Sequence, residues 1–183
     1  MRTTTLHITA LAAAALLIGC SSADDSKNAA SGAASRTVKV TLAPTQGRNV
    51  HGDLTLASAG TGVRITGKVD GLTPGSEHGF HIHEKGDCSA PDASSAGGHY
   101  NPSSMQHGNP GSGAHHAGDI RNLVADGGGS ANVDVIVEGV SIGGQNDVLG
   151  KAIVVHESPD DYASQPAGNS GARIACGVIP ANG

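Results

Sequence analysis

The chain has 183 residues, a formal net charge of −5 at pH 7 and only 2% aromatic residues. This length allows one domain with a hydrophobic core, which must be built from aliphatic side chains because aromatics are so few. The net charge argues against a nucleic-acid partner, and an anionic substrate would need a local positive patch. The 28 glycines favour many tight turns over long helices.

The first 35 residues have the pattern of a targeting segment followed by a tether. Arg2 precedes an apolar run at 8–18, too short to cross a bilayer, where roughly 20 apolar residues are needed. The run ends in Leu-Ile-Gly-Cys, which resembles a bacterial lipobox; the alternative is an ordinary secretory signal with a chance cysteine. We therefore expect a signal peptide at 1–19, a lipidated Cys20 and a flexible tether over 20–35. The protein would then be exported to the periplasm or cell envelope and held at a membrane by its lipid.

The cysteine count agrees with this expectation. The chain has three cysteines, and lipidation of Cys20 would leave Cys88 and Cys176. These two form an even pair in an oxidising compartment, where a disulfide can persist.

Residues 36–183 are expected to form one domain of short strands. Alternation of polar and apolar residues, as at 37–42, is typical of half-buried strands. Strands are predicted at 37–42, 50–56, 63–69, 79–84, 120–125, 131–137, 151–156 and 172–178. Between them lie two long segments, here named the first loop (85–117) and the second loop (157–171), and loops of this length are usually functional. Some eight short strands without a helical period predict an all-β sandwich or barrel.

Histidines gather in one stretch, because six of the ten fall between 79 and 119. His81 and His83 are two apart on a predicted strand, so their side chains point to one face. Neutral imidazole is the commonest metal ligand in proteins. Three imidazoles and one carboxylate suit zinc, and His99, His107, His116 and Asp119 would supply them. Nitrogen ligands suit copper(II), and His81, His83 and His156 offer them from two strands, so that one shared histidine would give a dinuclear site.

Spacing alone does not assign a role to the remaining polar residues. His115 lies beside His116, and spacing does not choose between them. His7, His51, His78 and His115, each taken singly, are interpreted as solvated histidines. Asp160, four residues after His156, is placed to accept the second N–H of a ligand histidine, or is a plain loop aspartate. Arg173 is either a surface arginine or, beside a copper site, a donor to a small anion.

Six motifs occur in an order that identifies a family. They are GFHIHEKGDC (79–88), SAGGHYNP (95–102), HGNPG (107–111), HAGD (116–119), VVHE (154–157) and GARIACGVI (171–179). Together they cover essentially the whole domain, and the chain resembles the bacterial copper/zinc superoxide dismutases in their lipoprotein form. The resemblance implies an eight-stranded antiparallel Greek-key β-sandwich or barrel with two long functional loops. It also implies that superoxide is converted to dioxygen and hydrogen peroxide, outside the cytoplasm, with one copper and one zinc per subunit.

The resemblance also implies a role for each site residue. Copper would be bound by His81, His83, His156 and a bridging His99, and zinc by His99, His107, His116 and Asp119, which favours His116 over His115. Asp160 would connect the two metal sides, Arg173 would guide and hold superoxide, and Cys88 would pair with Cys176. Bacterial members occur as monomers and as dimers, so a homodimer is an open alternative.

The sequence departs from the family in its second loop, and two other functions are possible for this fold. The second loop contains no Lys, Arg or Glu, whereas eukaryotic members carry a charged steering cluster there. Any steering charge would therefore come from elsewhere, for example from Lys85, Lys151 or Arg121. A module that buffers or delivers copper and zinc would be expected to lack a copper ligand or the arginine. A purely structural β-sandwich would not need seven ligands in register.

Overall fold

The computed structural model describes residues 36–182, so the signal peptide expected at 1–19, Cys20 and the tether over 20–35 lie outside the described residues. The described part forms nine strands and one short 3-10 helix. The strands are β1 (Thr37–Pro44), β2 (His51–Ala59), β3 (Gly62–Asp70), β4 (Glu77–His78), β5 (Phe80–His83), β6 (Leu123–Val124), β7 (Ala131–Glu138), β8 (Ala152–His156) and β9 (Arg173–Val178), and the helix covers Ser94–Ala96. Across residues 36–182, no helix has the length and hydropathy needed to cross a membrane.

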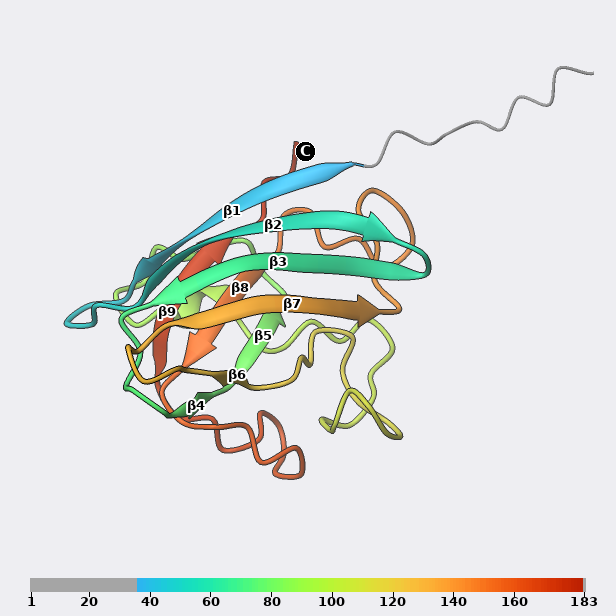
Figure 1. The fold of residues 1–183 in the computed structure, drawn as a ribbon. Coiled ribbons are helices and arrows are strands. Elements are labelled where there is room, and N and C mark those ends of the chain that lie inside the picture. The colour runs from blue at the N-terminus through green and yellow to red at the C-terminus, as the bar shows by residue number, and fades with distance from the viewer. Residues whose placement is uncertain (1–35, 183) are drawn as a thin grey trace, which may run out of the picture. The chain divides into compact units, whose positions relative to one another are not determined.

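Seven strands form one sheet in the order β5-β8-β9-β1-β2-β3-β7, and β4 pairs separately with β6. Every one of these strand pairs is antiparallel. Figure 1 shows that the sheet curls, so that β5, β8 and β9 lie behind β1, β2, β3 and β7. The all-β antiparallel fold class predicted from the alternation is therefore confirmed.

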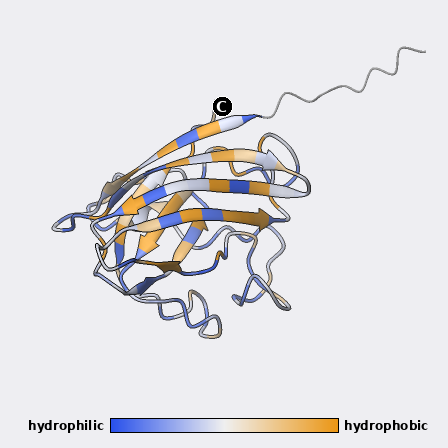
Figure 2. Cartoon of the chain, viewed as in Figure 1, coloured by the Kyte–Doolittle hydropathy of each residue, from blue (hydrophilic) through white to orange (hydrophobic). Residues whose placement is uncertain are grey.

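The hydrophobic core forms because buried apolar and exposed polar side chains alternate along β1 and its neighbours. On β1 the buried residues are Val38, Val40 and Leu42, each separated by an exposed polar residue. Their neighbours on β2, Leu54 and Leu56, are buried on the same side. Figure 2 shows the resulting alternation of hydrophilic and hydrophobic bands along these strands. Burial of such side chains stabilises the fold by about 1.5–3 kcal/mol for each large aliphatic residue.

Strand β5 is buried on both faces, and this positions the site. Phe80 and Ile82 belong to the main hydrophobic core. Because side chains alternate along a strand, His81 and His83 point to the opposite face, where they are also buried. The sequence Phe-His-Ile-His thus places two imidazoles on the outside of the core but beneath the loops.

The strands differ from the sequence prediction in the segment around Gly79. The strand predicted at 79–84 forms as β5, and a separate two-residue strand, β4, which was not predicted, lies just before Gly79. The strand predicted at 120–125 shrinks to β6, which pairs with β4 and not with β7. A two-residue strand shows no period, so the sequence could not reveal this pairing. Residues 126–130, between the strands predicted at 120–125 and 131–137, form a turn closed by a 2.8 Å hydrogen bond from the Asp126 amide to the Ser130 carbonyl.

Candidate metal centre

Four histidines form one cluster of potential ligand atoms, which we call the four-histidine group. It consists of His81 and His83 from β5, His156 from the end of β8, and His99 from the first loop. Their ligand atoms lie within 4.8 Å of one another, and all four side chains are buried. The antiparallel ladder pairs His81 with Val154 on β8, and His156 follows on the same face two residues later. A backbone bridge between His83 and His99 brings the first loop alongside β5.

A second cluster, the His–Asp group, lies in and after the first loop. It consists of His99, His107, His116 and Asp119, so His99 belongs to both groups. The Asp119 carboxylate organises it: Oδ1 lies 2.8 Å from His99 Nδ1, and Oδ2 accepts from the His116 amide at 2.8 Å and from the Gly108 amide at 3.2 Å. A backbone bridge from Asp119 to His81 fixes this end of the segment beside β5.

The ring nitrogens are divided between protein partners and the interior of the groups. His81 Nε2 contacts Asp160 at 2.8 Å, and His83 Nδ1 contacts the Gly97 carbonyl at 2.9 Å. In four of the histidines, one ring nitrogen is buried and has no hydrogen-bond partner. These atoms are His81 Nδ1, His99 Nε2, His107 Nδ1 and His116 Nδ1. Leaving a buried polar atom unsatisfied costs about 1–3 kcal/mol. Four such atoms facing two clusters are the arrangement expected of metal ligands, and in His81, His99 and His107 a carboxylate holds the second nitrogen.

Asp160 connects the two groups. It is buried, with Oδ2 on His81 Nε2 and Oδ1 at 2.9 Å from His107 Nε2. One carboxylate therefore orients a histidine of each group. Spacing indicated a contact with one ligand histidine, and the family resemblance implied a link between the two metal sides; the structure shows that the link joins His81 and His107.

Electrostatics favour ligand-competent protonation states. Burial, together with the neighbouring His99 and His156, lowers the pKa of His81 and His83 well below the usual value, and burial lowers the pKa of His156 to about 4. Burial alone would raise the pKa of Asp119, but hydrogen bonds from His99 and from two backbone amides outweigh it and hold the pKa far below normal. At neutral pH His81, His83 and His156 are therefore neutral and Asp119 is ionised, as metal binding requires.

Arg173 begins β9 and reaches the four-histidine group from the side. Its guanidinium donates to the carbonyls of Ala93 and Gly97, and Gly97 also meets His83 Nδ1. Arg173 lines a cavity of about 400 Å³ together with His83, His99 and His156. Burial lowers the pKa of Arg173, with nearby Asp92 opposing the shift, but arginine stays charged. The cavity therefore offers one fixed positive charge beside the imidazoles.

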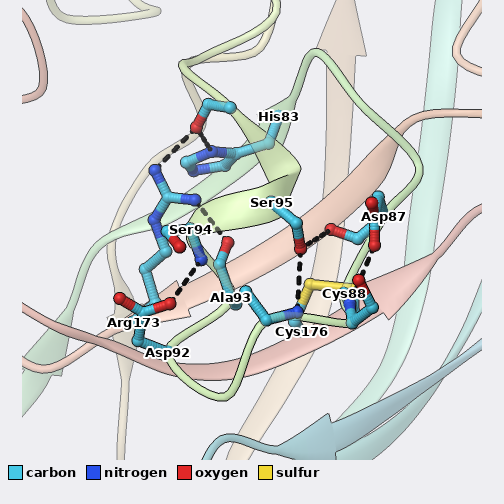
Figure 3. The surroundings of a disulfide bond; sticks show 12 residues. His83, Asp87, Cys88, Asp92, Ala93, Ser94, Ser95, Arg173 and Cys176 are labelled. Atoms are coloured by element: carbon cyan, nitrogen blue, oxygen red, sulfur yellow. Dashed lines mark hydrogen bonds between the residues drawn. A yellow bond between two sulfur atoms is a disulfide. The ribbon is translucent and has the colours of Figure 1, made fainter.

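A disulfide fixes the segment that holds Arg173. Cys88 in the first loop is bonded to Cys176 on β9, with Cα atoms 5.8 Å apart. The pairing implied by the family resemblance is confirmed. Figure 3 shows that Ala93, whose carbonyl accepts from Arg173, lies in the segment that the disulfide attaches to β9.

The prediction that His78 is solvated was wrong. His78 is only 3% exposed, and its Nδ1 lies 2.8 Å from the carbonyl of His156. A period of two would have placed it inside, because it has the parity of Phe80 and Ile82. His51 is exposed as predicted, and His115 stays outside both groups, with Nδ1 on the Gly113 carbonyl at 3.1 Å.

Of the three residues considered for steering, none lines the cavity that holds Arg173. Lys85 and Arg121 are exposed. Lys151 lies over the ring of Tyr100, with Nζ 5.0 Å from the ring centre.

The donor sets match two different metals. Four imidazole nitrogens suit copper(II), which prefers nitrogen ligands, and three imidazoles with one carboxylate suit tetrahedral zinc. The two groups therefore fit one copper and one zinc.

Comparisons with known proteins agree with this geometry. Residues 50–179 match the family model described as copper/zinc superoxide dismutase. A superoxide dismutase [Cu-Zn] of Aquifex aeolicus is 44% identical over 135 residues, covering 71% of this chain and 79% of that protein. An extracellular superoxide dismutase [Cu-Zn] of Haemonchus contortus is 43% identical over 138 residues, covering 70% and 72%. The crystal structure of a SOD-like protein from Bacillus subtilis is 40% identical, with a TM-score of 0.69, covering 77% of this chain and 97% of that one. The chain therefore belongs to the copper/zinc superoxide dismutase family.

Proposed function

We propose that this protein catalyses the dismutation of superoxide, with copper in the four-histidine group and zinc in the His–Asp group. One observation carries the proposal: two buried ligand groups share His99, and the cavity beside them contains Arg173. The names of the relatives support the same reaction. Superoxide is the substrate of the enzymes in this family.

The reaction is a pair of one-electron transfers. Copper, when bound, supplies that chemistry: one superoxide loses its electron and leaves as dioxygen, and a second gains the electron and two protons and leaves as hydrogen peroxide. The residues of the chain do the rest. Arg173 provides the positive charge that attracts an anion to an otherwise acidic protein. We assign His99 Nε2, which has no hydrogen-bond partner, to carry one of the two protons.

Zinc has no redox chemistry in proteins, so the role of the His–Asp group is to position His99 and not to transfer electrons. Its residues fix the ring of His99 from the Nδ1 side through Asp119, at 2.8 Å. Asp160 contacts His81 and His107 and so keeps the two groups in one orientation. These contacts hold His99 Nε2 toward the four-histidine group.

The test is superoxide consumption by the chain loaded with one copper and one zinc, compared with Arg173→Ala. We expect kcat/KM to fall by about 10- to 150-fold, the equivalent of the 1.5–3 kcal/mol of a hydrogen bond to a charged group. Arg64→Ala is the matched control, because it removes the same charge from the exposed face of β3.

Two outcomes would contradict the proposal. A folded chain that binds both metals but does not consume superoxide would favour a metal-buffering module. Equal losses in Arg173→Ala and Arg64→Ala would remove Arg173 from the substrate site and leave only a general effect of charge.

We further propose that the protein is exported and lipid-anchored, with a signal peptide at 1–19, the lipid on Cys20, a tether over 20–35 and the enzyme domain at 36–183. The lipobox-like sequence, the disulfide and an extracellular relative support this localisation. In a bacterial host the wild-type chain should fractionate with membranes, and Cys20→Ala should not. Membrane association that persists in Cys20→Ala would contradict the anchor.

A homodimer, as in some bacterial members, is the further assembly that we propose to test. Sedimentation equilibrium of the metal-loaded Cys20→Ala chain should give twice the monomer mass. A single monomer mass at every concentration would contradict it.

A further inference from the structure

The side chain of Gln165 in the second loop forms two hydrogen bonds with the main chain of His107 in the first loop. The His107 amide donates to Gln165 Oε1 at 2.9 Å, and Gln165 Nε2 donates to the His107 carbonyl at 2.9 Å. One primary amide thus satisfies both backbone polar groups of a single residue. Loop backbone without a ladder needs such partners, and these two residues are 58 positions apart in the chain.

The side chain of His107 is held from another direction. His107 Nε2 lies 2.9 Å from Asp160 Oδ1. Asp160 is in turn fixed by Asn122, which accepts from the Asp160 amide at 2.9 Å and donates to the Asp160 carbonyl at 3.0 Å. Asn122, which directly precedes β6, therefore holds the second loop at Asp160, and the second loop in turn holds the first loop through Gln165.

These two attachments determine where the free nitrogen of His107 points. His107 Nδ1 is buried, has no hydrogen-bond partner and lies 3.1 Å from Asp119 Oδ2. Gly168 permits the approach, because a Cβ on this glycine would collide with Asp160 and His107. The second loop thus closes directly over the residue that faces the His–Asp group.

Gln165 also precedes the wall of the neighbouring cavity. Pro166 and Ala167 follow it directly and line the cavity that contains His83 and Arg173. The residue that holds His107 is therefore followed directly in the chain by two residues that line the four-histidine cavity.

We propose that Gln165 is a positioning residue for the metal centre: its amide holds the His107 main chain so that Nδ1 faces the His–Asp group, and so fixes zinc there. This inference rests on the proposed function only in taking zinc as the ion of that group. It concerns binding and geometry, so it is tested without measuring dismutation.

The variant that tests it is Gln165→Met, which keeps the length of the side chain and removes both hydrogen bonds. Gln165 is exposed on its outer side, so the core is untouched. We expect the zinc affinity, measured by competition with a chelator, to fall about tenfold, the lower end of the range for residues that orient metal ligands. Gln145→Met, at an exposed glutamine of another loop, is the matched control and should bind zinc as the wild type does.

A spectroscopic measurement separates positioning from general stability. Cobalt(II) bound in place of zinc has visible absorption bands that depend on ligand geometry, and these should shift in Gln165→Met but not in Gln145→Met. Exchange of the His107 amide, followed in the metal-free protein, should be faster in Gln165→Met.

The outcomes are distinct. Zinc affinity and cobalt bands in Gln165→Met equal to wild type would overturn this inference while leaving the proposed function intact. A lower unfolding stability with unchanged zinc affinity would assign Gln165 a purely structural role and would also overturn it. A wild-type chain that binds zinc but consumes no superoxide would overturn the proposed function alone.

Discussion

The two ligand groups are built in different ways. In the four-histidine group, three members lie on β5 and β8, where backbone ladders place them. In the His–Asp group, single backbone bridges tie His99 and Asp119 to β5, and the segments of His107 and His116 depend on hydrogen bonds to the Asp119 carboxylate. Repeating backbone contacts fix the first group, and individual side-chain contacts fix the second. The first should therefore tolerate loop changes that disrupt the second.

The largest expected effect comes from cutting the covalent link between loop and sheet. The Cys88–Cys176 bond spans 88 positions, and the double variant Cys88→Ala/Cys176→Ala should lower the free energy of unfolding by about 4 kcal/mol. Because Cys88 belongs to the first loop and Cys176 to β9, the change should loosen the loop before the strands. Urea unfolding of the metal-free oxidised chain measures this effect. A change below about 1 kcal/mol would mean that the loop is already ordered by its other contacts.

The second-largest expected effect is on metal binding, and it should differ between the two groups. Asp119→Asn keeps the shape of the side chain but removes the charge that accepts from His99 and two amides. Zinc affinity should fall by at least about 100-fold, more than is typical for residues that only orient ligands, while copper binding to the four-histidine group persists. Metal titrations measure both, with Asp134→Asn on the exposed face of β7 as the control. Parallel loss of both metals would show that the groups are not independently built.

A change in the strand scaffold should lower the stability of the fold but leave metal binding by both groups intact. Ile82 is fully buried between His81 and His83 on β5. Ile82→Val should cost about 0.5–1.5 kcal/mol of unfolding free energy and leave both metal affinities within about twofold, because backbone pairing still places the histidines. If copper affinity fell tenfold instead, core packing and not the ladder would position the group.

The smallest effect concerns the second loop and pH. Hydrogen bonds from Ser164 and Ala163 lower the pKa of Asp161 from its ordinary value of 3.8 to about 2. Since the folded state binds this proton more weakly than the unfolded state, the stabilisation is complete above about pH 4 and is lost as pH falls toward 2. The difference in stability between wild type and Asp161→Asn should therefore disappear over that interval, as measured by urea unfolding of the metal-free chains. A difference that stays constant down to pH 2 would contradict the assigned cause.

The site itself was largely predictable, because its signals are local. The spacing of His81 and His83 gives a shared face directly, and the ordered motifs contain the remaining ligand histidines and Asp119. Asp160 lies outside these motifs and was assigned from its position four residues after His156 and from the family resemblance. His78, taken singly, was interpreted as solvated, although its alternation with Phe80 and Ile82 would have indicated burial. Its contact with the His156 carbonyl could not be seen in the sequence, because the two residues are 78 positions apart.

The sequence by itself determined the all-β class, the two long loops and the residues available for metal binding, because alternation and short motifs depend on near neighbours in the chain. Only the tertiary structure decided that β4 pairs with β6, that Asp160 meets both His81 and His107, and that Gln165 holds His107. These contacts join loop segments without a period, and their partners are chosen by how the curled sheet brings distant segments together.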